Sequence, residues 1–471
     1  MAHGVQIQEV PTGVKPAARV TAGLPTYVGT APINAGDLTC VNVPRVYYKL
    51  EEAEADLGPV SDPSKWSQWT LHEAVHAHFS TYNVGPIVCI QVLDPDDTDH
   101  VATTTGQSHQ LVAGKVKLQV YGGPDEPMLG ILKSTVVVKV ESVTKTLGTD
   151  YTLDFDDDGF LVVTRKSTGN IPSDSSIITA DFHYLDPSGV AAADVVGGYS
   201  GGSYKGVAAI DQVYPRLRLV PGLLLSPGYS HLPTVATALS AKAHAVNGAF
   251  RALAVCDLST DVAAIPTYAD AGAWKANNGF DQLDQVTTWP KVKNGANVYH
   301  SSTVFACVCD VTDAANAGVP FASPSNKAVS ATAAVNDDGD EILLDRSQAN
   351  ALNAQGIVTV LNGFYGWRLW GNRTLFRSSE WMFKAQRETM SYYELVLQDA
   401  FDWIIFSLND ATGRAQVSAT LNDLFQKEYK KRALDNDYDA ARVSPECIDA
   451  LVFMALHYLS LYSDELDKAQ L

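Results

Sequence analysis

The sequence lacks any long uninterrupted apolar run. No window reaches the roughly 18 consecutive apolar residues that a membrane-spanning helix needs. The first ten residues, MAHGVQIQEV, also lack the basic start and apolar stretch of a secretory signal. We therefore expect neither secretion through such a signal nor direct insertion into a membrane.

Basic residues are scarce relative to acidic ones. The chain has 34 Lys and Arg against 53 Asp and Glu, which gives a formal net charge of −19. A field of this sign repels phosphate backbones. The charge balance thus argues against direct binding of nucleic acid.

Cysteine is also scarce, with six residues in 471 and no C-x-x-C pair. Cys307 and Cys309 alternate along the apolar run VFACVCDV, a pattern that favours a strand with both thiols on one face. Scattered cysteines inside apolar runs are typical of buried, reduced thiols in a cytosolic protein. This pattern predicts no disulfide framework.

What the chain does have is a repeated alternation of apolar strands and helices. PTYVGTAP predicts a strand, residues 71–79 a helix and residues 87–93 a buried strand, which together resemble half of a βαβ unit. After residue 188 the run RLRLVPGLLLSPG, an amphipathic helix in LPTVATALSAKAHAVNGAF and the strand RALAVCDL repeat the pattern. The sequence therefore predicts an α/β core with a parallel sheet and flanking helices.

Three further regions differ from this core. Residues 1–25 have a short alternating pattern followed by Pro and Gly, which predicts a strand on a flexible lead. Residues 104–188 contain short Val- and Thr-rich runs between turn signals, which predicts an inserted all-β module. From about residue 350 a strand-rich stretch gives way to mainly helical sequence, which predicts an α+β C-terminal domain in residues 350–471.

Residues 70–79, TLHEAVHAHF, contain an H-E-x-x-H pattern. On one helix, His72 and His76 would share a face and bind Zn²⁺, with Glu73 as general base of a peptidase. No third ligand follows, because position 79 is Phe and the next Glu is Glu126. The same letters form a T-x-x-E capping box, in which Glu73 would return to the Thr70 N–H. We interpret the segment as structural and predict no zinc site.

The run DFDDDG begins like a calcium-binding loop. Asp154, Asp156 and Asp158 have the spacing of ligands, but the twelfth position, which should be Glu, is Arg165. The flanking residues favour strands, so we interpret this run as an acidic hairpin turn.

Two further motifs were weighed for catalysis. The glycine-rich residues 197–206 lack the Gly-Lys-Ser/Thr of a phosphate loop. Ser226 follows an apolar strand but has no G-x-S-x-G elbow and no persuasive Asp and His partners. The sequence therefore predicts no enzyme activity and no cofactor.

Several stretches, in order along the chain, resemble the contractile tail sheath proteins of bacteriophages and related contractile injection particles. They are HGVQIQEVPTGVKP with TYVGTAP, AVHAHFSTYNVGPIVCIQVLD, DVVGGYSGGSYKGVAAI, PGLLLSPG, SPSN at residues 323–326, LNAQGIVTV and GWRLWGNRTL. The most specific is the last, which contains Trp367, Arg368, Trp370, Gly371, Asn372, Arg373 and Thr374. We expect Trp370 to anchor the core and Arg373 to form a charge-assisted bond.

The resemblance implies an organisation of the chain. Residues 1–25 would be an N-terminal linking arm, and residues 26–103 and 189–349 a discontinuous subtilisin-like core without proteolytic activity. Residues 104–188 would be an inserted domain that faces outward. Residues 350–471 would be a C-terminal sheath domain near the inner tube. The arm strand would be Val5, Gln6, Ile7, Gln8, Glu9 and Val10. The final residues, after Pro445, are ambiguous between helix and strand.

The resemblance also implies a function and partners. Subunits would form stacked six-membered rings around a tail tube, contact baseplate and tail terminator proteins, and contract to drive the tube through a target envelope. The protein would lie in a virion tail or bacteriocin particle assembled in the host cytoplasm. Two alternatives stay open: a zinc metallopeptidase, and another virion structural protein such as a capsid component.

Overall fold

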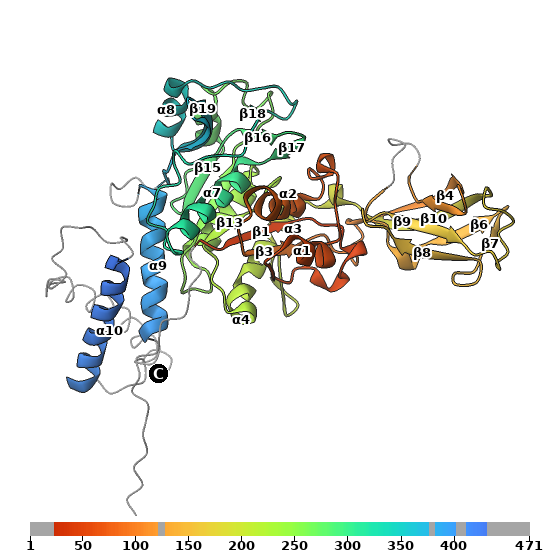
Figure 1. The fold of residues 1–471 in the computed structure, drawn as a ribbon, viewed down its shortest axis with the longest axis horizontal. Coiled ribbons are helices and arrows are strands. Elements are labelled where there is room, and N and C mark those ends of the chain that lie inside the picture. Colours follow the sequence, from red (N-terminus) through yellow and green to blue (C-terminus); the bar gives the residue numbers. More distant parts are fainter. Residues whose placement is uncertain (1–22, 121–127, 376–381, 402–410, 431–471) are drawn as a thin grey trace, which may run out of the picture. The chain divides into compact units, whose positions relative to one another are not determined.

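The fold is described from a computed structural model that covers residues 23–120, 128–375, 382–401 and 411–430 (Figure 1). The chain divides into two compact units. The first comprises Thr21–Glu388 and contains every strand named below. The second includes the rest of helix α9 and helix α10, and is treated by itself.

An eight-stranded sheet organises the first unit. Its order is β2-β3-β1-β13-β14-β15-β19-β20, and the six inner strands are parallel. Antiparallel β2 and β20 close the two edges. The strands are β1 Pro25–Gly29, β2 Arg45–Tyr47, β3 Ile87–Gln91, β13 Leu223–Leu225, β14 Leu253–Asp257, β15 Gln285–Thr288, β19 Ile357–Gly363 and β20 Gly366–Trp370.

Helices cover both faces of this sheet. The chain runs from β1 through α2 (Thr70–His76) to β3 in one direction, and from β13 through α5 (Pro233–His244) to β14 in the other. Because such crossovers are right-handed, the two helices lie on opposite faces. Strands β1, β3, β13 and β14 are buried throughout, as their unbroken apolar runs predict. The predicted parallel sheet with flanking helices is confirmed.

Residues between β3 and β13 include a separate set of strands. One sheet has the order β4-β10-β6-β7 and another the order β5-β9-β8. Side chains from both, such as Phe182 and Leu153, share one apolar core. The strands are β4 Val101–Gln110, β5 Lys115–Lys117, β6 Val137–Val140, β7 Val143–Thr144, β8 Tyr151–Phe155, β9 Leu161–Arg165 and β10 Ile177–Leu185.

The remaining elements connect these sheets. The helices are α1 Leu50–Leu57, α3 Ala192–Val196, α4 Val213–Leu217, α6 Ala271–Asn277, α7 Ser301–Ala315, α8 Arg346–Ala354, α9 Lys384–Phe401 and α10 Ala411–Lys430. The strands are β11 Gly198–Ser200, β12 Ser203–Lys205, β16 Lys291–Asn294, β17 Asn297–Tyr299 and β18 Ala333–Val335. Among the described residues, no helix has the length and apolarity that crossing a bilayer requires.

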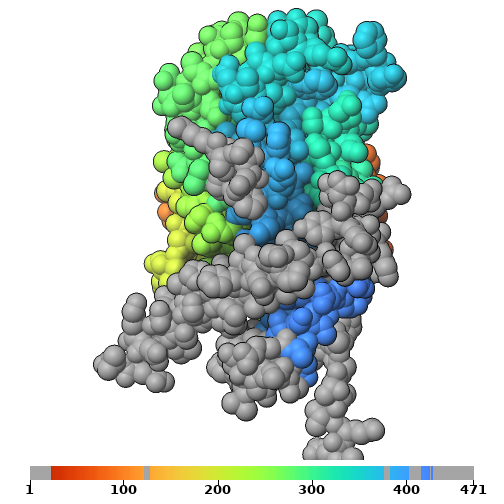
Figure 2. Space-filling view, turned by 90° about the vertical axis from the view of Figure 1, so that its left-hand side faces the viewer, coloured from red at the N-terminus to blue at the C-terminus, as the bar shows by residue number. Residues whose placement is uncertain are grey.

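Two expectations about elements were wrong. Cys307 and Cys309 lie in α7 rather than in a strand, and both are fully buried because α7 packs against β13, β14 and β15. Strand β19 pairs in parallel with β15, so it continues the core sheet instead of beginning a new domain at residue 350. In the space-filling view of Figure 2, the green to light-blue segments of this unit lie against one another.

Candidate functional site

Open α/β sheets bind ligands where the strand order reverses, outside the carboxyl ends of the strands. In this sheet the reversal lies between β1 and β13, because the chain leaves β1 toward β3 and later returns to β13. Thr30 and Ser226 directly follow these two strands. This place is therefore the first candidate for a ligand site.

The crevice at this reversal is filled by protein side chains. Thr30 N–H donates to Thr70 Oγ1, and Thr70 N–H donates to Thr30 Oγ1, both at 3.2 Å. A methyl group at Gly29 would lie 2.3 Å from Thr70 Oγ1, so the start of α2 sits directly on the strand end. The buried Ser226 hydroxyl donates to the Val28 carbonyl at 2.8 Å. Ser226 is thus a structural hydroxyl, and the groups at this strand end bond to one another.

The H-E-x-x-H helix adjoins this crevice, but its two histidines bind different partners. His72 Nε2 lies 2.5 Å from the Gly58 carbonyl, while His76 Nδ1 lies 3.0 Å from the Tyr299 hydroxyl. Burial lowers the pKa of His72 to about 4, so this ring is neutral. The two histidines and Glu73 do not converge on one point as ligands of a single ion would.

Glu73 caps a helix, but not its own. Its carboxylate accepts the backbone N–H of His300 and the ring Nδ1–H of the same residue, both at 2.6 Å. His300 immediately precedes α7. The predicted capping box at Thr70 is therefore wrong, because the partner that competes for Glu73 lies 227 residues away in the chain.

A second carboxylate completes the cap of α7. Asp257, at the end of β14, accepts the backbone N–H of Ser302 at 2.9 Å and its hydroxyl at 2.5 Å. Thr288 and Ser230 hydroxyls donate to the same carboxylate at 2.9 and 3.0 Å. These four donors occupy both oxygens, so Asp257 has no free lone pair directed at a substrate. The arrangement is that of a structural anchor for the positive end of a helix.

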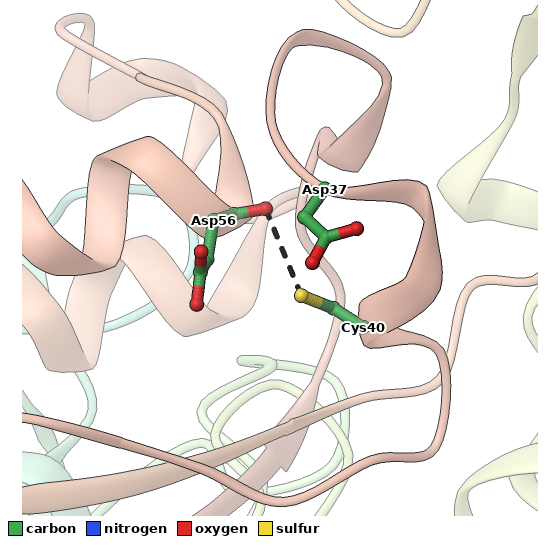
Figure 3. A group of neighbouring side chains, drawn as sticks. All are labelled: Asp37, Cys40 and Asp56. Atoms are coloured by element: carbon green, nitrogen blue, oxygen red, sulfur yellow. Dashed lines mark hydrogen bonds between the residues drawn. The ribbon is translucent and has the colours of Figure 1, made fainter.

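One set of potential metal ligands does converge among the described residues. Asp37, Cys40 and Asp56 offer one atom each within 4.8 Å of one another (Figure 3). Arg45 lies 3.0 Å from Asp37 Oδ2 and 3.9 Å from Asp56 Oδ2, so its charge offsets part of theirs. Burial raises the pKa of the Cys40 thiol to about 12, which disfavours the thiolate that a metal would need. These residues fit a turn held by ion pairs better than a metal centre.

The acidic run of the calcium-like motif forms the turn between β8 and β9. The two strands pair antiparallel, so the predicted hairpin is confirmed. Asp156 lies 2.6 Å from Lys117 Nζ, with Asp158 at 3.8 Å, and Asp154 lies 3.5 Å from Lys133 Nζ. Lysines therefore face the carboxylates that a calcium ion would use.

The glycine-rich residues 197–206 form the β11–β12 hairpin. The hairpin borders a cavity of about 220 Å³, lined on other sides by Asn42, Asp94, Asp97, His100 and Asp194. The three carboxylates here do not converge within ligand distance of one ion. The cavity holds no arrangement of nucleophile and base.

The Trp367–Thr374 motif lies on the edge strand β20 and just after it. Trp370 is only partly buried; its Nε1–H donates to Asn350 Oδ1 at 2.9 Å, and the Arg346 guanidinium lies 5.5 Å from its ring centroid. Its neighbour Leu369 is 1% exposed. Leu369 is the core residue of this strand, so the expectation that Trp370 anchors the core was wrong. The side chains alternate across β20, and the register places Leu369 inward.

Some predicted residues lie outside the described part of the chain. The arm strand Val5, Gln6, Ile7, Gln8, Glu9 and Val10 and the residues after Pro445 belong to these segments. For Arg373, within the described part, the backbone bridges to Phe383. The charge-assisted bond expected of its guanidinium remains a prediction.

Sequence reasoning also missed two separate features: the Asp257 carboxylate at the start of α7, and the buried pair of Lys384 and Glu388. Asp257 stood in the run RALAVCDL as a carboxylate directly after an apolar strand, a position that signals a group at the sheet's carboxyl edge. Lys384 and Glu388 have the i,i+4 spacing of a helical ion pair. The position of Asp257 and the spacing of Lys384 and Glu388 are therefore the sequence signals for these contacts.

Comparison with known proteins gives consistent results. No protein-family model matches the chain. The tail sheath protein of Burkholderia phage BcepMu is 28% identical over 383 residues, which are 79% of this chain and 74% of that protein. A putative prophage major tail sheath protein of Pseudomonas aeruginosa is 32% identical over 226 residues, which are 45% of this chain and 54% of that protein.

The fold has relatives among solved structures. The helical sheath of the anti-feeding prophage in its contracted state matches with a TM-score of 0.50 and 13% sequence identity. The match covers 93% of this chain and 88% of that one. At this identity the likeness concerns the fold alone.

Proposed function

We propose that the chain is a contractile tail sheath protein of the kind found in phages and related particles, and that it polymerises as stacked six-membered rings around a tail tube. It is a structural subunit and not an enzyme. Contraction of the polymer would then drive the tube through the envelope of a target cell.

One observation carries this proposal. The similarity to a phage tail sheath protein extends over 79% of the chain rather than over one motif. The filled crevice at the sheet's reversal point supports the same conclusion, because the groups that a hydrolase would direct at a substrate hold α2 and α7 in place instead. A zinc peptidase is therefore not favoured.

The position of β1 supports a mechanical role for the segment before it. β1 lies inside the sheet, paired in parallel with β3 on one side and β13 on the other. Force applied to the chain before Pro25 would load several backbone hydrogen bonds at once. We infer that residues 1–25 act as a linking arm, with Val5–Val10 adding a strand to the sheet of a neighbouring subunit.

The remaining assignments follow the family resemblance. We propose that the α/β core, which includes β19 and β20, is subtilisin-like, that residues 104–188 face outward, and that the residues after the core sheet lie toward the tube. The tube, baseplate and terminator proteins would be its partners, with assembly in the host cytoplasm and no cofactor. The extended lattice would be metastable, so that larger subunit contacts in the contracted state release free energy.

Electron microscopy of the purified chain tests the proposal. A sheath protein should form tubes, whereas a capsid component should form shells or sheets. Deletion of residues 2–10 should leave a folded monomer with nearly unchanged Tm that no longer forms tubes. Ile7→Pro should act in the same way, since proline removes a ladder donor, and Ile7→Val is the matched control that keeps the strand. Ordered tubes from the truncated chain would show that the arm is not the linker.

A further inference from the structure

The first turn of α9 meets the core through charged side chains rather than apolar ones. Lys384, Arg387 and Glu388 are each at most 6% exposed, although all three carry ionisable groups. Lys384 pairs with Glu388 one turn further along the helix and lies 3.9 Å from Asp313 Oδ2 on α7. Arg387 Nε lies 3.4 Å from Asp284 Oδ1, just before β15. This attachment therefore depends on buried electrostatics.

Among the residues that the structure describes, the charges around Lys384 do not balance. Asp310, Asp313 and Glu388 surround this one ammonium group, and all of them are buried or nearly so. We call Asp310, Asp313, Lys384 and Glu388 the joint cluster. Two uncompensated negative charges on side chains buried this deeply are too costly to persist. At least one carboxyl of the joint cluster must therefore hold a proton.

The neighbouring side chains in the described part of the chain do not supply the missing positive charge. His78, on the π-helix Ala77–Tyr82, lies 3.6 Å from Asp310, but its Nε2 is bonded to the Tyr27 hydroxyl at 2.8 Å. Burial lowers the pKa of His78 to about 3, so the ring is neutral. The Cys307 and Cys309 thiols also face the cluster, and burial raises the pKa of both. Arg387 is engaged with Asp284.

The joint cluster also touches the root of the N-terminal segment. A methyl group at Gly23 would lie 3.2 Å from both Asp313 Oδ2 and Glu388 Oε1, and Gly23 has a φ of +74°. Only glycine suits this position, because a side chain would be strained and would press on two carboxylates. The cluster thus lies where the chain enters β1 and where α9 leaves the core.

We propose that the joint cluster is a proton-controlled joint, which fixes the first turn of α9 to α7 while it holds a proton and loosens when that proton leaves. The reason is electrostatic: the extra negative charge appears only after the proton is lost. The proposal goes beyond the sheath function and does not depend on it.

The direction of the pH effect follows from the groups involved. Burial raises the pKa of Glu388 to about 7, partly offset by Lys384, and burial also raises the pKa of Asp313. A carboxyl with a raised pKa in the docked state stabilises docking below its ordinary pKa, and that stabilisation is lost as pH rises through the raised value. Docking of α9 should therefore weaken between about pH 5 and pH 8.

Hydrogen exchange on the full chain, in low salt where the formal charge of −19 opposes association, tests the joint. After correction for intrinsic rates, protection of residues 384–388 should fall about tenfold from pH 6 to pH 8.5, as a shift from 4.5 to about 7 requires. β14 (Leu253–Asp257) in the same spectra is the internal reference. A wild-type profile that is flat relative to β14 overturns the proposal without any variant.

Substitutions then identify the group that titrates. Glu388→Gln, which imitates the protonated form, should remove the tenfold change, and Asp313→Asn should reduce it. Glu394→Gln, the same chemical change further along α9, is the matched control and should keep the wild-type profile. A full pH response in Glu388→Gln would mean that the joint cluster is not its source.

Discussion

At the scale of single residues, Glu73 shows how a sequence motif can be read correctly as structural and still be assigned the wrong contact. The missing third ligand was visible in the sequence, and it removed the zinc interpretation. The true partner, His300, was not visible, because nothing in a sequence pairs a carboxylate with an N–H group 227 residues later. The residue types of this site were therefore predictable, while its contacts were not.

The contact predicts a large effect of substitution. Glu73→Ala removes two charge-assisted hydrogen bonds and leaves the His300 ring and N–H buried without an acceptor. We expect a loss of about 3 kcal/mol in the free energy of unfolding, measured by urea denaturation. A cap on its own helix would cost only about 1 kcal/mol. Glu51→Ala, an exposed carboxylate on α1, is the control and should change stability by less than about 0.5 kcal/mol.

The same contact should set the charge of His300. Burial lowers the pKa of this ring, but the charge of Glu73 and its hydrogen bond together raise the pKa by more, so the net shift is upward. Stability from this pair is then full below about pH 6.5 and falls as pH rises through the folded pKa. In Glu73→Gln, NMR titration should place the His300 pKa below that of the wild type. An unchanged or higher value would contradict the ion pair.

At the scale of elements, unbroken apolar runs predicted the parallel strands well. β1, β3, β13 and β14 were all expected, as was α5 between the last two. The run that contains Cys307 and Cys309 was assigned to a strand and is a helix. A helix buried on nearly every side shows no clear period, so an apolar run fits both structures until its full length is considered.

β20 gives a test of side-chain position within one strand. Leu369→Ala should cost about 2–5 kcal/mol, because it empties a buried site. Trp370→Ala should cost less, about 1–2 kcal/mol, since its ring is partly exposed and loses one hydrogen bond and the contact with Arg346. Thermal unfolding of the two variants side by side measures the difference.

Trp370→Phe helps to separate the two contributions, because it keeps an aromatic ring for Arg346 to contact and removes the bond to Asn350 along with part of the ring surface. Trp370→Phe should destabilise the protein, but by less than Trp370→Ala does. If Trp370→Ala were the more damaging of the two alanine variants, the inward face of β20 would be the one that carries Trp370.

At the scale of the whole molecule, the pattern of strands and helices in the sequence predicted the α/β class of the fold but not the boundary between its domains. The expected boundary at residue 350 followed a change from strand-rich to helical sequence, yet β19 and β20 extend the core sheet and the compact unit ends at Glu388. Sheet pairing between distant segments leaves no local trace in composition. The family resemblance implied the same boundary at residue 350, so it did not reveal this pairing either.

Net charge predicts how assembly should respond to salt. Each subunit carries a formal charge of −19, so bringing subunits into a ring opposes like charges. Raising NaCl from 10 to 150 mM shortens the screening length from about 30 to about 8 Å. The fraction of chain that sediments as tubes should therefore increase over this range. MgCl₂ at equal ionic strength should act similarly if screening is the cause, and the chain without residues 2–10 should remain monomeric throughout. If tubes instead dissolve as NaCl rises, ion pairs between complementary patches hold the subunits together, and the acidic surface does not oppose their association.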